Sequence, residues 1–436
     1  MTVWRRNVVA VYAMCVVMYG SRASISPLLL MMSEDLGYDR DGIAVLLASF
    51  SFGYIWLQVL AGVVSQRIGS KIVMLVAMLG CGLSLLAVSC CRSSRQVGLA
   101  LGMLGVFHAP MMPVRFDIYA RWVPVRDRGS VITYEGVWSL LGILAFTYCS
   151  PKLAAWFGWR SVFVAQAVVQ LGCAVCWQMY TDASPDTSRI KISAEELAVL
   201  PKLAPTQTGE GDANSKCGNR SGFPWWLFTR RATWALVIAH TAGNYGGRMI
   251  EAWQPLFYKD TLGVPPDRAA VYFMLPSLAG LGGRFLLGRF VPVLSARAGW
   301  STLQLRCYSS HAACFGSAAA CAAFAHAQSV SLATAALCAH KVFECFHSSG
   351  YGASYLEVGA DNTSVLTGVG NTIANVGSLV APVLGATLLR TFDNSWLPVF
   401  YSSGAFYAIA TCFYARWIAT QAELPNDDHN EVQKKK

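Results

Sequence analysis

The chain has 436 residues, of which 54% are hydrophobic and only 13% are charged. Soluble globular proteins carry about 25% charged residues, so this composition excludes an ordinary soluble domain and predicts an integral membrane protein. The net charge is +10, but the basic residues fall mostly in alternate loops between apolar segments. That distribution is typical of membrane topology, so we expect a lipid bilayer around the protein and no nucleic-acid partner.

Apolar segments of about 20 residues, long enough to cross a bilayer as a helix, recur along the whole chain. Separated by polar breaks, they predict an all-α membrane protein with about twelve transmembrane helices. The expected helices cover residues 8–32, 42–64, 71–91, 96–121, 129–150, 159–181, 232–257, 268–292, 303–326, 328–356, 362–389 and 396–419.

The longest polar interruption divides these helices into two sets of six, so we expect two pseudo-symmetric halves. The predicted organisation is an N-terminal six-helix bundle over 1–181, a linker over 182–231, a C-terminal six-helix bundle over 232–420 and a tail over 421–436. Basic residues concentrate near the termini and in the linker, which predicts that linker, tail and both termini are cytoplasmic. The sequence does not indicate which membrane the protein occupies.

Arg22 is the only charged residue in the first apolar segment. A guanidinium facing lipid at that depth costs several kcal/mol, so Arg22 is a candidate functional residue that faces a water-filled cavity or an anionic partner. The alternative is that it lies near the outer end of the helix and extends to the headgroups. Glu34 and Asp35, which follow the segment, keep that alternative open.

Several motifs occur in one order along the chain. They are the stretch 53–71 with Gly62, Arg67 and Gly69, the turn Arg121-Trp122-Val-Pro124, the linker stretch 192–196 followed by Pro224-Trp225, and Gly368-Val-Gly-Asn371-Thr372. Together these motifs resemble the major facilitator superfamily, specifically its anion:cation symporter family, which includes vesicular glutamate transporters, sialin and plastid phosphate transporters.

The resemblance implies a major facilitator fold and a secondary active transporter. Such a protein moves a small, organic anion with protons or sodium ions by alternating access, as a monomer and without a further cofactor. In this family an arginine late in the first helix binds the substrate anion, and Arg22 occupies that position, three residues after Tyr19. We expect Tyr19, Tyr245, Arg248 and Asn371 to complete the substrate site.

The chain also departs from the family's pattern. An arginine and a proton-coupling glutamate are usual in the fourth helix, but the matching positions hold Leu101 and His108. The arginine of the seventh helix in glutamate transporters is replaced by Gly243. Proton coupling is therefore lost or rebuilt. His108 is one candidate because histidine titrates near neutral pH, although it can equally be a histidine hydrogen-bonded to a neighbouring helix.

Other charges in the expected helices offer further candidates for proton coupling, above all Glu135 in the fifth helix. Arg248 and Glu251 are three residues apart on one helix and can neutralise each other. Arg115 and Asp117 lie nearer the cytoplasmic end, where a gating or structural charge network is expected.

The tenth expected helix carries an unusual polar stripe. His340, Glu344 and His347 are spaced four and three residues apart and share one helix face, with Lys341 beside them. A proton relay or substrate contact through His340 and Glu344 is one interpretation, and an internal Lys341–Glu344 ion pair is the other. Nothing else in the sequence supports metal binding here, so no metal site is expected.

Two further functional interpretations remain. A monocarboxylate-transporter-like member of the same superfamily fits the loop glycines almost as well. A transporter-derived receptor that binds without translocating would account for the missing coupling residues. An enzyme is not expected, because the sequence shows no nucleophile–base pair in a supporting context.

Overall fold

The computed structural model describes residues 2–38, 40–201, 223–264 and 266–419. The predicted tail and the middle of the predicted linker lie outside these residues. The chain folds into two compact units. The first comprises Met1–Val125, Glu135–Asn219 and Asp361–Val369, and the second comprises Arg126–Tyr134, Arg220–Ala360 and Gly370–Lys436.

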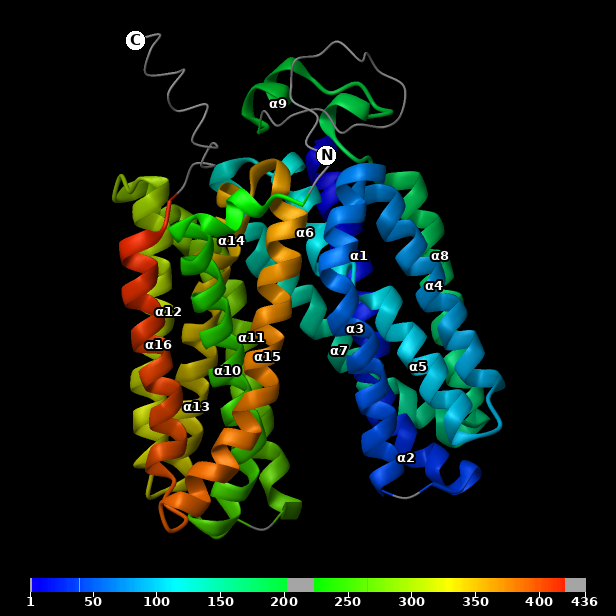
Figure 1. Cartoon of the computed structure of the whole chain (residues 1–436), viewed down its shortest axis with the longest axis vertical. Coiled ribbons are helices and arrows are strands. Elements are labelled where there is room, and N and C mark those ends of the chain that lie inside the picture. Colours follow the sequence, from blue (N-terminus) through cyan, green and yellow to red (C-terminus); the bar gives the residue numbers. More distant parts are fainter. Residues whose placement is uncertain (1, 39, 202–222, 265, 420–436) are drawn as a thin grey trace. The chain divides into compact units, whose positions relative to one another are not determined.

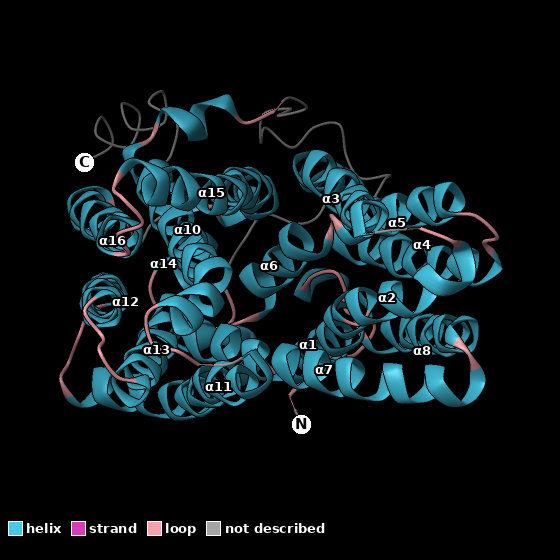
Figure 2. Cartoon of the chain, turned by 90° about the horizontal axis from the view of Figure 1, so that it is seen from below, coloured by secondary structure: helices cyan, strands magenta, loops and turns pink. Residues whose placement is uncertain are grey.

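The described residues form α-helices and short 3₁₀-helices, with no strand among them (Figure 2). Every expected segment is helical, which confirms the predicted all-α membrane fold. Among the described residues, eight helical segments are long and apolar enough to cross a membrane.

The first unit is built from the helices of the first half of the sequence (Figure 1). They are α1 (Val3–Ala23), α2 (Ile25–Leu36), α3 (Arg40–Ile68), α4 (Ser70–Cys90), α5 (Ser94–His108), α6 (Met111–Trp122), most of α7 (Arg128–Phe157) and α8 (Trp159–Tyr180), with the short linker helix α9 (Ala194–Val199). Helix α4 packs against both α5 and α8, and α3 packs along α5. The linker is held to the first helix, because the backbone N–H of Trp4 donates to Glu196 at 2.8 Å.

The second unit contains the remaining helices. They are α10 (Arg231–Asp260), α11 (Pro266–Arg297), α12 (Thr302–Ala325), α13 (Val330–Glu344), α14 (Tyr351–Val358), most of α15 (Thr363–Thr391) and α16 (Leu397–Trp417). Helix α13 lies between α11 and α12, and α16 packs against α10 and α12 (Figure 2). An aromatic cluster around Phe257, Phe324 and Phe400 fills the core between α10, α12 and α16.

Three expected helices are interrupted rather than continuous, and the first break follows Arg22. Helix α1 ends at Ala23 and α2 begins at Ile25. Pro27 cannot donate a hydrogen bond to the carbonyl of Ala23, four residues earlier, and its ring crowds that carbonyl. The hydroxyls of Ser21 and Ser24 also donate to backbone carbonyls within the helix, at 3.0 and 2.9 Å, which tends to bend helices.

The other two breaks lie in the fourth and tenth expected helices, which occupy corresponding places in the two halves of the sequence. Ala109 and Pro110 separate α5 from α6, and proline again explains the interruption. In the tenth expected helix, α13 ends at Glu344. The 3₁₀-helix η4 (Cys345–Ser348) follows it and precedes α14. No proline is involved there. Gly350 leaves helical geometry, with ψ of −118°, and its Cα approaches the backbone of Ser310 on α12 too closely for a larger residue to fit comfortably.

Candidate functional site

Arg22 is the penultimate residue of α1, directly before the first break. Its guanidinium carbon lies 4.8 Å from the ring centre of Phe50 and 5.1 Å from that of Tyr54, both on α3. Among the described residues, Arg22 makes no ion pair with a carboxylate. A cation–π contact contributes up to about 2 kcal/mol, so the rings stabilise the charge without neutralising it. The positive charge of Arg22 therefore remains available to an anion.

Close packing of α3 on α5 positions these rings. A side chain on Gly53 would collide with the carbonyl of Gly102, and one on Gly105 would collide with the carbonyl of Phe50, so the two backbones touch. This contact brings His108, the last residue of α5, against Phe50, with ring centres 5.6 Å apart. The Nδ1 atom of His108 lies 3.5 Å from the Cys81 sulfur, and the imidazole is fully buried.

Glu135 forms a buried ion pair with Arg115. The carboxylate Oε1 lies 3.2 Å from the Arg115 Nη1, and the two side chains are only 6% and 8% exposed. The same nitrogen donates to the Tyr19 hydroxyl at 2.8 Å. Tyr19 therefore contacts Arg115 directly, and the structure shows no hydrogen bond between Tyr19 and Arg22.

Helix α7 reaches this pair through another close backbone contact. A side chain at Gly142 would collide with the backbone of Val16 on α1. Because α1 and α7 touch there, Glu135 on α7 and Tyr19 on α1 both reach Arg115 on α6. Asp117, two residues further on α6, instead accepts hydrogen bonds from Arg121, at 3.1 Å, and from Ser70.

The second unit contains a connected series of charges. Arg248 pairs with Glu251 at 3.0 Å on α10, where both side chains are about half exposed. Lys341 on α13 lies 2.9 Å from Glu344 and 3.6 Å from Glu251. Both ion pairs that the sequence allows, Arg248–Glu251 and Lys341–Glu344, are thus present.

The predicted stripe on the tenth helix is only partly continuous. His340 Nδ1 lies 3.9 Å from Glu344, one turn along α13. The sequence predicted that His347 would continue this helix face, and that prediction is wrong. The chain has already changed to the tighter η4 at His347. Its ring packs between Tyr351, with centres 4.9 Å apart, and Tyr407, at 6.3 Å. Among the described residues, no group of three or more His, Cys, Asp or Glu side chains is arranged to hold a metal ion.

The remaining expected substrate residues lie elsewhere in the second unit. Tyr245 is buried against α16, where its hydroxyl lies 2.9 Å from the Ser402 hydroxyl and its ring packs on Phe406. Asn371 is buried on α15, and its backbone carbonyl accepts a hydrogen bond from the Asn375 side chain at 2.7 Å.

Arg284 on α11 is a further candidate residue that the sequence alone did not single out. It lies close enough to Lys341, His347 and Tyr351 for its charge to act on each of them. The signal that singled out Arg22 applies here as well, because Arg284 is a lone charge within an apolar stretch of an expected helix.

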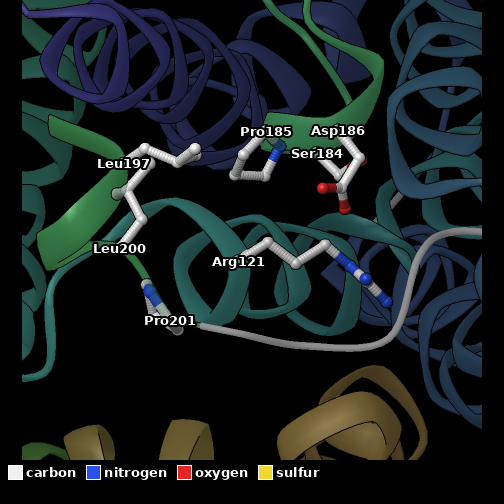
Figure 3. Close-up of a pocket in the computed structure, with 7 residues that line it drawn as sticks. All are labelled: Arg121, Ser184, Pro185, Asp186, Leu197, Leu200 and Pro201. Atoms are coloured by element: carbon white, nitrogen blue, oxygen red, sulfur yellow. The ribbon is translucent and has the colours of Figure 1, made fainter. Parts of the chain in front are cut away.

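A cavity of about 230 Å³ lies at the linker end of the first unit (Figure 3). It contains none of the charged groups described above except Arg121, which is already paired with Asp117. Figure 3 shows that Arg121 lines one side of the cavity and that residues of the linker line the rest of it. The lining residues are Arg121, Ser184, Pro185, Asp186, Leu197, Leu200 and Pro201. Arg22 and the other buried charges lie outside this cavity, so the cavity is not the candidate site that the sequence predicts.

Comparison with known proteins gives a consistent result. The family model described as Major Facilitator Superfamily matches residues 11–338. A probable chloroplastic anion transporter 1 of Oryza sativa subsp. japonica is 26% identical over 89% of this chain and 72% of its own length. The chloroplastic ascorbate transporter of Arabidopsis thaliana is 24% identical over 89% of this chain and 70% of its own length. The crystal structure of the E. coli fucose:proton symporter superposes with a TM-score of 0.71 at 12% identity, covering 95% of this chain and 98% of that one.

Proposed function

Because the chain belongs to the Major Facilitator Superfamily, we propose that it is a secondary active transporter of a small organic anion, with Arg22 binding the anionic group. The transported anion moves with protons or sodium ions, and its binding site opens alternately to each side of the membrane. The relatives named for anion and ascorbate transport support this substrate class.

The observation that carries the proposal is the state of Arg22. Its described contacts are the faces of Phe50 and Tyr54, which hold the guanidinium without neutralising its charge. A guanidinium presents planar N–H donors that match the two oxygens of a carboxylate or phosphate. A charge without a counter-ion inside a membrane protein raises the free energy of the protein, and a bound anion would offset that cost.

Coupling to protons would use the buried groups near Arg22. His108 lies against the same Phe50 ring as Arg22. A bound anion would offset the charge of Arg22, so that a protonated His108 would face a neutral pair instead of a lone cation. Anion binding and proton binding would then favour each other.

Glu135, Glu344 and His340 are the other candidate proton carriers. Each already lies beside a charged neighbour. Glu135 pairs with Arg115, Glu344 pairs with Lys341, and His340 lies beside Glu344.

We also propose that both termini are cytoplasmic and that a single chain is the functional unit.

The test is uptake of radiolabelled anions by proteoliposomes, with and without a pH or sodium gradient. The panel comprises ascorbate, gluconate, glutamate and phosphate. Arg22→Ala should reduce uptake to background, and Arg22→Lys should retain only a small fraction, because an ammonium lacks the paired donors.

Arg5→Ala is the matched control. Arg5 lies at the other end of α1 and also contacts an aromatic ring, that of Trp4, at 5.3 Å. Its replacement removes the same charge and the same kind of contact, and uptake should remain close to wild type. Near-normal uptake by Arg22→Ala would contradict the proposal, and binding without flux under every gradient would indicate a receptor instead of a transporter.

A further inference from the structure

The second unit contains a buried histidine whose ring nitrogens are both without a hydrogen-bond partner among the described residues. His347 is 7% exposed, and neither Nδ1 nor Nε2 makes a hydrogen bond there. Nδ1 of His340 likewise makes no hydrogen bond with a described residue, since the Glu344 carboxylate lies 3.9 Å away. Buried polar atoms in native proteins are nearly always satisfied, so these nitrogens indicate a ligand or water at this place.

Helix α10 presents glycine to these groups. A Cβ atom at Gly243 would lie 3.6 Å from His347 Nε2 and 3.5 Å from the Tyr351 hydroxyl, and a Cβ at Gly247 would lie 3.0 Å from a Glu344 oxygen. The polar atoms of η4, α14 and α13 therefore face two glycines of α10, Gly243 and Gly247. Glycine allows a ligand to approach the backbone closely.

A positive charge is brought to the same place by α11. Helix α11 packs on α13 through Gly280 and Gly283, where added Cβ atoms would lie 3.4 Å from Lys341 and 3.5 Å from the Cys345 sulfur. The Cys345 thiol donates to the Gly280 carbonyl at 3.4 Å. Arg284 directly follows Gly283 on this packed part of α11, its charge acts on His347, and it makes no ion pair with a described carboxylate.

The surrounding charges leave a positive surplus. Arg248 and Lys341 are balanced by Glu251 and Glu344 through the ion pairs described above. Among the described residues whose charge acts on His347, Arg284 is the cation that these ion pairs leave unbalanced. The site also lies at a break in a membrane helix, where substrate and ion sites of transporters are commonly formed.

We propose that Arg284, His347 and Tyr351 form a second anion-binding site, within the second unit, that takes a carboxylate or phosphate group. Arg284 supplies the charge and two parallel donors, and the imidazole and the phenol hydroxyl supply further hydrogen bonds. Because all three residues belong to the second unit, this site does not depend on Arg22.

The test measures thermal unfolding of the purified protein with gluconate, glutamate or inorganic phosphate, each against chloride at constant ionic strength. Stabilisation by at least one of these anions should persist in Arg22→Ala. Adding Arg284→Ala to Arg22→Ala should weaken that binding roughly tenfold or more, the factor expected for loss of a charge-assisted hydrogen-bond pair. Preference for gluconate or glutamate would identify a carboxylate site, and preference for phosphate a phosphate site.

Two further variants separate binding from folding. Arg289→Ala, also made in the Arg22→Ala background, removes an exposed arginine five residues further along α11 and should leave binding unchanged. Gly243→Ala adds a methyl group at ordinary contact distance, so it should fold normally while weakening anion binding. Should Arg284→Ala prove unstable, Arg284→Lys should fold and bind severalfold more weakly.

Three results would overturn the proposal: no probe anion stabilises the wild-type protein, Arg22→Ala alone removes all anion binding, or Arg284→Ala binds as Arg22→Ala does. Loss of all binding in Arg22→Ala would leave the proposed function intact. Normal uptake by Arg22→Ala would instead contradict the proposed function alone.

Discussion

The buried ion pair of the first unit and the charge series of the second differ in how firmly each charge is held. Arg115 and Glu135 are both more than nine-tenths buried, and Tyr19 is their neighbour. Lys341, by contrast, lies within 4 Å of two carboxylates, one of which belongs to a half-exposed pair. A partly exposed charge with a second carboxylate in reach can exchange partners at low cost, whereas separating a deeply buried pair exposes two charges to an apolar interior. The second unit is therefore better suited to charge rearrangement, and the first to holding Arg115 and Glu135 in a fixed geometry.

The largest effect should come from breaking the buried pair. Glu135→Leu leaves Arg115 buried without its described ion-pair partner, which should destabilise the protein by about 3–5 kcal/mol. The double variant Glu135→Leu with Arg115→Met should recover most of that loss, because no buried charge remains. Thermal unfolding of the single and double variants in one detergent measures both. A single variant as stable as wild type would show that the pair does not hold the first unit together.

An intermediate effect is expected from Glu344→Gln. Lys341 keeps Glu251 at 3.6 Å, so the loss should be about 1–3 kcal/mol, smaller than for Glu135→Leu. If Glu344 also carries the coupling proton, uptake driven by a pH gradient should fall while exchange of labelled for unlabelled anion continues. Unchanged pH-driven uptake would exclude Glu344 as the proton carrier.

The smallest effect is expected from Arg248→Ala. The Arg248–Glu251 pair is about half exposed, and such pairs contribute at most about 1 kcal/mol and weaken with salt. The free energy of unfolding should change little. Its small difference from wild type should shrink further when the salt concentration rises from about 0.05 to about 0.5 M, because the electrostatic screening length shortens over that range. A loss comparable to that of Glu135→Leu would mean that the charge series is as firmly held as the buried pair, and the contrast between the units would fail.

The sequence alone determined the helices, because each apolar segment must satisfy its own backbone hydrogen bonds in the membrane and only a helix does so within one segment. It also allowed the ion pairs Arg248–Glu251 and Lys341–Glu344, which the structure contains, since a spacing of three residues places both partners on one helix face. The breaks after Ala23 and before Met111 were not predicted, since helices 8–32 and 96–121 were expected to be continuous, although Pro27 and Pro110 mark both places by a local rule. Arg22 was found as a charge that lipid cannot accommodate.

Only the tertiary structure decided which helices bring their polar groups together. Arg115 and Glu135 lie on different helices, as do Arg284 and His347, and no spacing along the chain relates them. The first proximity depends on the backbone contact at Gly142, where the absence of a side chain lets α1 and α7 touch, and the second depends on the packing of α11 on α13 beside Gly280 and Gly283. The break at Gly350 has the same origin, since it accompanies a close approach to α12. Local hydrogen bonding fixes a helix from its own residues, but the partner of a buried charge is fixed by packing between segments far apart in sequence.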